Sequence, residues 1–325
     1  MDIMIQGLAL VVAALCAAVM GLAIQRGATC TVAAVEEVMQ RGSGSRLLAL
    51  IEASIWVGGG MLVLDRLHLL ARMPAGFALG ANTLLGAVLL GLGAFVNRAC
   101  VFGAIARFGS GEWAYIMTPV GFYLGCLGVA AVPARASGMV IAAPSALFDA
   151  PVEVAWAFLA FFVWRLAHPM LRDRGALRRQ LAERVWTPHA ATCVIGVMFL
   201  ATLVLAGSWA YTDALADLAR GMTRNLSARM LLAASLFAGA AVGGWKTTRF
   251  HRSAPRAGDV LRCLLGGGLM GCGSVLIPGS NDGLILVGLP LLRPYAWVAF
   301  GTMCAAIAVA HWASARFVRT MVARQ

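Results

Sequence analysis

Residues 84–103 read LLGAVLLGLGAFVNRACVFG, and residues 264–283 read LLGGGLMGCGSVLIPGSNDG. Each stretch runs from an apolar, glycine-rich segment into a more polar loop, and the two overlay when the chain is shifted by 180 residues. Seven of the twenty aligned positions are identical, and the glycines keep the same spacing. Self-similarity at a fixed shift predicts that the chain contains two related halves.

The composition predicts a membrane protein. Hydrophobic residues make up 61% of the 325 residues, charged residues make up 12%, and the mean hydropathy is +0.83. Soluble domains carry roughly 25% charged residues, so this chain has too little polar surface for a water-soluble body. Nine segments are apolar over about the length that crosses a bilayer: 4–24, 47–64, 76–96, 115–133, 151–168, 190–208, 229–244, 260–276 and 295–313. We therefore predict an all-α polytopic membrane protein with about nine transmembrane helices.

The repeat divides this single membrane domain, residues 1–325, into two parts. A first repeat of four spans (1–150) is followed by a linking helix (151–168) and a second repeat of four spans (184–325). One linking span inverts the second half, so the segments 76–96 and 260–276 are expected to cross in opposite directions. Inverted repeats are typical of transporters and place the substrate near the bilayer midplane. In the alternative interpretation, two glycine-rich helices merely pack closely.

The net charge of +12 indicates topology rather than nucleic-acid binding, because no RNA- or DNA-binding motif accompanies the basic residues. With nine spans, 19 of the 26 basic residues fall in loops on one side of the membrane. The excess of positive charge places this side in the cytoplasm, with the N-terminus periplasmic and the C-terminus cytoplasmic. The basic loops 165–188 and 245–262 could also bind anionic membrane lipids or an acidic partner.

Each glycine-rich segment ends in a loop that is too polar to face lipid: Asn97–Gly103 in the first half and Pro278–Gly283 in the second. Such backbone occurs at membrane depth only where protein or a water-filled cavity surrounds it. Both loops lead into short apolar stretches, which we interpret as re-entrant half-helices at 97–107 and 278–292. The N-terminus of a half-helix carries partial positive charge, so two that converge predict an anion site.

Cys100 and Ser280 occupy equivalent positions in this overlay, and Cys30 lies in a third candidate loop, 25–31. The eight cysteines form neither a C-x-x-C pair nor a Cys/His cluster with zinc spacing, so neither a metal nor another cofactor is expected. A thiol is a weak, polarisable donor that suits a soft, sulfur-bearing anion. Cys100 could instead only fill space in the core.

Other polar residues also admit two interpretations. Arg98 and Arg107 could bind substrate or anchor a cytoplasmic loop, and Asn281 and Asp282 could simply cap a half-helix. Glu52, inside the second span, could be functional or could pair with Arg46. The residues predicted to form the substrate path are Cys30, Cys100, Ser280, Asn281, Asn97, Arg98, Gly103 and Gly283.

Residues 91–125 resemble the first signature of the YeeE/YedE family of sulfur-compound transporters, and residues 266–301 resemble its second. The early sequence RGATC, residues 26–30, is similar to a third element of that family. The resemblance implies a bacterial inner-membrane protein that takes up thiosulfate along a line of cysteine thiols, two of them Cys30 and Cys100. A cytoplasmic sulfurtransferase-type protein is a possible partner, and some relatives are associated with selenium.

The second signature departs from the family pattern, because Ser280 stands where a third cysteine is usual and Asp282 adds a negative charge. A hydroxyl favours harder oxygen atoms and cannot perform thiol chemistry. The serine therefore argues against thiosulfate as the specific substrate more than against transport of a sulfur compound in general. We expect a transporter and not an enzyme. The alternatives are a sulfur-transfer component that accepts a persulfide on Cys30 or Cys100, and a transporter of a related sulfur or selenium compound.

Overall fold

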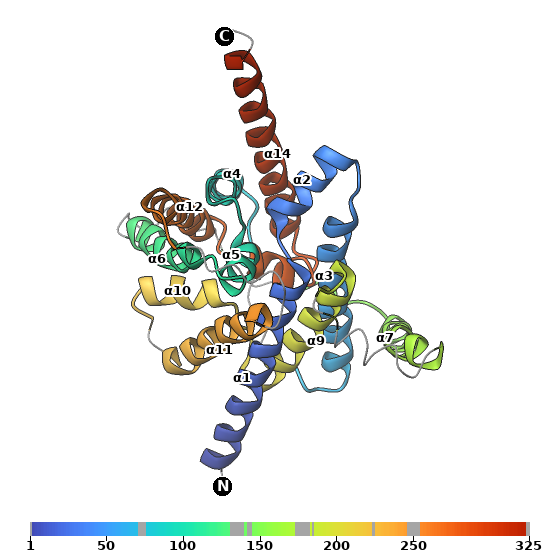
Figure 1. The fold of residues 1–325 in the computed structure, drawn as a ribbon. Coiled ribbons are helices and arrows are strands. Elements are labelled where there is room, and N and C mark those ends of the chain that lie inside the picture. Colours follow the sequence, from blue (N-terminus) through green and yellow to red (C-terminus); the bar gives the residue numbers. More distant parts are fainter. Residues whose placement is uncertain are drawn as a thin grey trace.

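The computed structural model describes residues 2–70, 76–130, 140–141, 145–172, 183, 185–222, 225–245 and 254–322. The long helices are α1 (Asp2–Gly27), α3 (Ser45–Arg66), α4 (Ala81–Asn97), α6 (Met117–Ala130), α7 (Val152–Arg172), α9 (Pro188–Ala206), α11 (Leu226–Trp245), α12 (Ala257–Leu276) and α14 (Pro294–Val322). The short helices are α2 (Thr31–Arg41), α5 (Val101–Gly109), η1 (Trp113–Ile116), α10 (Tyr211–Ala219), α13 (Asn281–Gly283) and the π-helix η3 (Leu284–Gly288). Figure 1 shows α5 near the middle of the molecule with long helices around it.

Each of the nine predicted spans corresponds to one long helix, which confirms an all-α polytopic membrane protein. Seven helical stretches in the described part of the chain are long and apolar enough to cross a membrane. Two of them join a long helix to a short one: 6–41 contains α1 and α2, and 81–109 contains α4 and α5. The remaining two predicted spans are α6, which belongs to a shorter apolar helix at 113–129, and the linking helix α7.

The predicted start of the third span is wrong. Helix α4 begins at Ala81 rather than at residue 76, because Gly76 and Phe77 form the strand β1 (Gly76–Phe77). This strand pairs antiparallel with β2 (Val140–Ile141). Pairing with β2 satisfies the backbone hydrogen bonds of these residues without a helix, and a hydropathy pattern does not detect such pairing.

The helices pack in reciprocal pairs. Helix α1 packs against α11 and α3 against α9, while α6 packs against α12 and α14 against α4. A shift of 180 residues places α1 on α9, α3 on α11, α4 on α12 and α6 on α14. It therefore turns the α1–α11 pair into the α9–α3 pair, and the α6–α12 pair into the α14–α4 pair. The packing is that expected of two halves related by a two-fold axis. The limits of the two repeats remain a prediction.

The crossing of α4 and α12 has the same symmetry at the level of single residues. A Cβ added to Gly86 would lie 2.7 Å from the carbonyl oxygen of Gly273, and one added to Gly93 would lie 2.7 Å from that of Gly266. The 180-residue shift takes Gly86 to Gly266 and Gly93 to Gly273, so it turns one contact into the other. The two helices run antiparallel, and only glycine permits this approach of their backbones.

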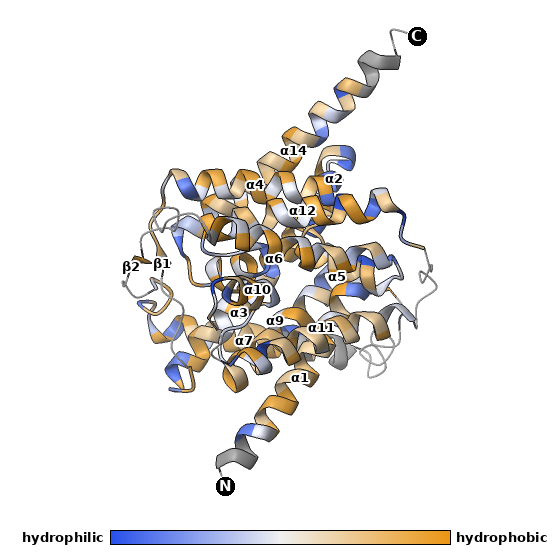
Figure 2. Ribbon diagram, turned by 90° about the vertical axis from the view of Figure 1, so that its left-hand side faces the viewer, coloured by the Kyte–Doolittle hydropathy of each residue, from blue (hydrophilic) through white to orange (hydrophobic). Residues whose placement is uncertain are grey.

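Apolar side chains cover much of the outside of the protein. Figure 2 shows helices that are hydrophobic over most of their length, with hydrophilic residues mainly at their ends and in the loops. The N-terminal part of α1 and the C-terminal part of α14 extend from the body in opposite directions (Figures 1 and 2). Large side chains such as Leu8, Leu15, Val309 and Trp312 are exposed there. A surface of this kind requires lipid around it.

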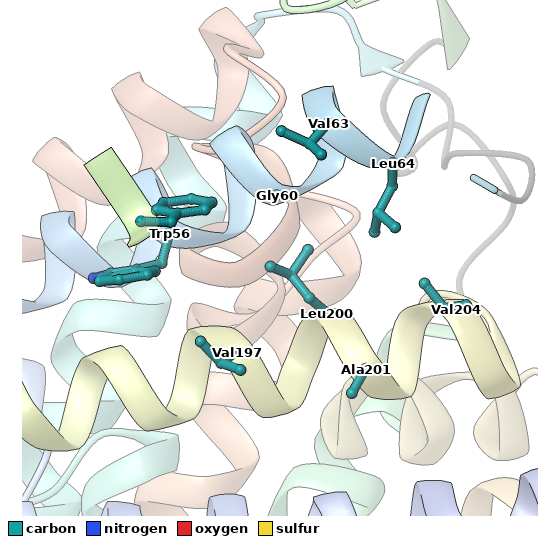
Figure 3. Close-up of a pocket in the computed structure, with 9 residues that line it drawn as sticks. Trp56, Gly60, Val63, Leu64, Val197, Leu200, Ala201 and Val204 are labelled. Atoms are coloured by element: carbon teal, nitrogen blue, oxygen red, sulfur yellow. The ribbon is translucent and has the colours of Figure 1, made fainter. Parts of the chain in front are cut away.

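An apolar groove of about 320 Å³ lies between α3, α7 and α9. Figure 3 shows Trp56, Gly60 and Val63 on one side of it and Val197, Leu200 and Val204 on the other. Its lining contains almost no polar surface, so this groove suits hydrocarbon chains and not a hydrated anion.

Candidate functional site

The two predicted half-helices are present. Helix α4 ends at Asn97, the chain turns through Arg98 with a φ of 57°, and Cys100 is the N-cap of α5. In the second half α12 ends at Leu276, and Ser280 is the N-cap of α13. The second half-helix begins at Asn281, within the predicted stretch 278–292, and polar Asn281 and Asp282 lie in its first turn.

Two further short helices were not predicted. Cys30 is the N-cap of α2, and Ala210 is the N-cap of α10. In the 180-residue register Ala210 corresponds to Cys30, as Ser280 corresponds to Cys100. The signal for α2 and α10 was available in the sequence, since each follows a polar interruption in matching positions of the two halves. The predicted spans 4–24 and 47–64 instead left the residues of α2 in the loop between them.

The first residues of these four helices meet. The backbone N–H of Thr31 donates to the sulfur of Cys100 at 3.1 Å, and the Thr31 hydroxyl donates to Asn281 Oδ1 at 3.1 Å. The Thr212 hydroxyl donates to Asp282 Oδ1, which joins α10 to α13. These bonds connect segments that are up to 250 residues apart in the sequence.

Cys30 joins this group through Gly103, near the start of α5. A Cβ added to Gly103 would lie 2.5 Å from the Cys30 sulfur, so glycine leaves the space that the thiol occupies. Cys100 is the N-cap of α5, and its sulfur accepts from the N–H of Thr31, the residue after Cys30, so both cysteines lie at the start of α5. Cys100 is fully buried, whereas Cys30 is partly accessible. The two cysteines at the start of α5 therefore differ in accessibility, Cys30 being the more accessible.

Four helix N-termini at one point create a region of positive potential. The first turn of each helix has backbone N–H groups without a partner in its own helix, and the aligned peptide dipoles add partial positive charge. Such ends attract anions without any charged side chain. Because α2 and α5 come from one half of the chain and α10 and α13 from the other, the site is shared between the halves.

Two buried donors beside these N-termini have no partner in the part of the chain that the structure describes. Ser280 is 1% exposed and its Oγ makes no hydrogen bond, and Asn281 is 0% exposed and its Nδ2 makes none. Buried polar groups are nearly always satisfied, so unsatisfied donors beside helix N-termini indicate that they serve a ligand. Both residues belong to the predicted substrate path.

The other predicted path residues lie in different surroundings. Asn97 is fully bonded, donating to the Ala99 carbonyl at 2.8 Å and accepting from Thr118 at 3.1 Å, so it holds the loop in place. Arg98 is exposed, away from the buried centre. Gly283 follows Asp282, and a Cβ added to it would lie 3.7 Å from both carboxylate oxygens of Asp213.

The remaining ionisable candidates are engaged elsewhere. Arg107 pairs with Glu112 at 3.2 Å. The suggested pair of Glu52 with Arg46 is wrong: Arg46 pairs with Glu37, while Glu52 contacts His189 and lies 3.9 Å from Arg165. His189 belongs to α9 and Arg165 to α7. Both are distant from Glu52 in the sequence, so spacing along the chain could not predict these contacts.

Comparison with known proteins identifies the family. A family model for sulphur transport matches residues 26–309, which include all four of the short helices. The thiosulfate transporter TsuA of Escherichia coli (strain K12) is 23% identical to this chain over 331 residues, with 92% of each protein covered. The match spans both halves and the centre where they meet. The chain therefore belongs to the sulphur transport family of membrane proteins.

Proposed function

We propose that this protein takes up a small sulfur-containing anion through the centre where α2, α5, α10 and α13 begin. Thiosulfate is the substrate we propose first. The observation that carries the proposal is the meeting of Cys30, Cys100 and Ser280 at these N-termini. A divalent anion with one terminal sulfur and several oxygens matches thiols on one side and a hydroxyl and an amide on the other.

In this proposal the thiols act first. Cys30 is partly accessible and Cys100 is buried, so an anion that enters at Cys30 passes to Cys100 before it reaches Ser280 and Asn281. The N–H of Thr31 donates to the Cys100 sulfur at 3.1 Å, which favours electron density on that sulfur and orients the thiol hydrogen away from α2. The thiol hydrogen is then available to a substrate.

We further propose a bacterial inner membrane as the location, with the basic loops in the cytoplasm. The unequal distribution of the basic residues supports this orientation. Membrane lipids are the expected neighbours of the apolar exterior, and a cytoplasmic sulfurtransferase-type protein is a proposed recipient of the transported compound.

Uptake of radiolabelled thiosulfate into proteoliposomes tests the proposal. Cys100→Ala should lower uptake at least about tenfold, because it removes a buried thiol donor at the centre where the helices begin. Cys16→Ala is the matched control, since Cys16 lies on α1 away from the short helices and should transport normally. Normal uptake by a stably folded Cys100→Ala variant would remove the thiols from the path.

The position of both Cys30 and Cys100 at the start of α5 favours one alternative, a sulfur-transfer component of the membrane. In that case a thiolate attacks thiosulfate, forms a Cys–S–S bond and releases sulfite. Purified protein incubated with thiosulfate would then carry the mass of one added sulfur atom on Cys30 or Cys100, and sulfite would appear in equal amount. Uptake of intact thiosulfate, with neither product, supports transport instead.

A further inference from the structure

A buried carboxylate lies at the same helix N-terminus as the unsatisfied donors. Asp282 is 2% exposed and belongs to the first turn of α13, directly after Ser280 and Asn281. Its Oδ1 accepts hydrogen bonds from the Thr212 hydroxyl and from the backbone N–H of Gly283, the latter at 3.0 Å. The ionised carboxylate thus occupies one N–H group and one hydroxyl that would otherwise be available to an anionic substrate.

A second carboxylate stands beside it. Asp213 lies in the first turn of α10, and a Cβ added to Gly283 would be 3.7 Å from both of its oxygens. Asp213 is only partly buried, so it connects Asp282 to a more accessible part of the protein. Asp217 lies one turn further along α10, on the same face.

The charges around this pair are unevenly distributed. Asp217 pairs with Arg229 of α11 and lies 4.0 Å from Arg220. Within the described residues neither Asp213 nor Asp282 forms an ion pair. The other titratable groups near them are two buried tyrosines and a buried thiol, which are neutral in their ordinary state: Tyr211, Tyr295 and Cys126.

An ionised carboxylate and a divalent anion cannot both occupy one helix N-terminus at low cost, because like charges in a weakly polar interior repel strongly. Protonation removes this conflict, as the neutral acid competes less for the Gly283 N–H and can itself donate. Binding of the anion and binding of a proton then favour each other, by the reciprocity of linked equilibria.

We propose that Asp282, with Asp213 as its link to the more accessible side, takes up a proton when the anion binds and releases it when the anion leaves. Uptake of the anion is then coupled to movement of protons in the same direction. The proton comes from the solution on the entry side, forms an O–H bond on the carboxylate and is lost to the solution on the exit side. This coupling rests on the proposed function, and it identifies the proton as the ion that drives uptake.

The test uses the full-length protein in proteoliposomes that contain a pH-sensitive dye, with radiolabelled thiosulfate as the substrate. In the wild type, thiosulfate should acidify the lumen, and uptake should rise as the external pH falls from about 8 to about 6. Linkage to a single proton allows at most about a tenfold change per pH unit. The dye and the radiolabel measure the two movements separately.

Asp282→Asn should lose thiosulfate-dependent acidification and give a flat pH profile, because the amide can still accept from Thr212 but cannot titrate. Asp213→Asn should reduce the rate of acidification, which provides a second variant if the first folds poorly. Glu153→Gln is the matched carboxyl-to-amide control: Glu153 is exposed at the start of α7 and its loss should leave both readouts unchanged.

Three outcomes would overturn the coupling. They are thiosulfate uptake by the wild type without acidification, an unchanged pH profile in Asp282→Asn, and uptake that depends on Na⁺ at constant pH. A wild type that takes up no thiosulfate at any pH overturns the proposed function, and the coupling with it.

Discussion

The hydroxyl of Thr31 donates a hydrogen bond to Asn281 at 3.1 Å, although the two residues are 250 positions apart. Thr31 is the first residue of α2, and Asn281 is the first residue of α13. The bond therefore joins the start of a short helix from one half of the chain to the start of a short helix from the other. A centre built in this way depends on both halves at once.

Thr31→Val removes this bond while keeping the size of the side chain. Asn281 Oδ1 then loses its partner in a buried position, so we expect the free energy of unfolding to fall by about 1–3 kcal/mol and thiosulfate uptake to fall with it. Thermal unfolding in detergent and uptake measurements check both effects. Thr202→Val is the control, because the Thr202 hydroxyl donates to the Met198 carbonyl of its own helix, at 2.8 Å, and so joins no two segments. Equal behaviour of the two variants would contradict a role for the Thr31 bond.

Ser280→Cys tests how the serine at the position of the family's third cysteine affects substrate selectivity. A third thiol is a softer partner for the terminal sulfur of thiosulfate, so competition by sulfate against thiosulfate uptake should weaken about fivefold, equivalent to about 1 kcal/mol. The inhibition constant of sulfate is the quantity to measure. Ser314→Cys, on the exposed part of α14, should change nothing. An unchanged sulfate constant would mean that position 280 does not contact the anion.

Gly103→Ala tests the space beside Cys30. The added methyl group would lie 2.5 Å from the Cys30 sulfur, so the thiol must move from its position beside α5. Overpacking of this kind costs about 1–3 kcal/mol, and uptake should fall even where the protein still folds. Gly301→Ala adds the same methyl group to α14 where no atom lies within 4 Å, and it should transport normally. Full uptake by Gly103→Ala would show that the relative position of the two thiols is unimportant.

Gly86→Ala tests the crossing of α4 and α12. Its methyl group would lie 2.7 Å from the Gly273 carbonyl oxygen, so the two backbones must separate. We expect a loss of about 1–3 kcal/mol in the free energy of unfolding, measured by thermal or denaturant unfolding in detergent. Gly128→Ala, with no atom within 4 Å, should be neutral or slightly stabilising. If Gly128→Ala lowered the free energy of unfolding by a similar amount, the effect of Gly86→Ala could not be assigned to the contact between α4 and α12.

The parts of the candidate site that sequence could predict are those with a local signal. Glycine spacing aligned Cys100 with Ser280, and a polar interruption between apolar segments indicated a half-helix after each. The same reasoning could not assign Asn97, whose side chain is bonded to Ala99 and Thr118. It also could not tell that Glu52 meets His189 of α9, since such partners depend on how helices pack.

Sequence alone determined that the chain is a helical membrane protein, that its halves are related by a shift of 180 residues, and that Cys100 and Ser280 are equivalent. These properties follow from hydropathy and spacing, which are local quantities. Only the tertiary structure decided that four short helices begin at a common centre, that Gly103 leaves room for Cys30, and that Asp213 stands beside Asp282. Each of these contacts joins distant segments whose approach is set by the packing of the long helices, and no local pattern encodes that distance.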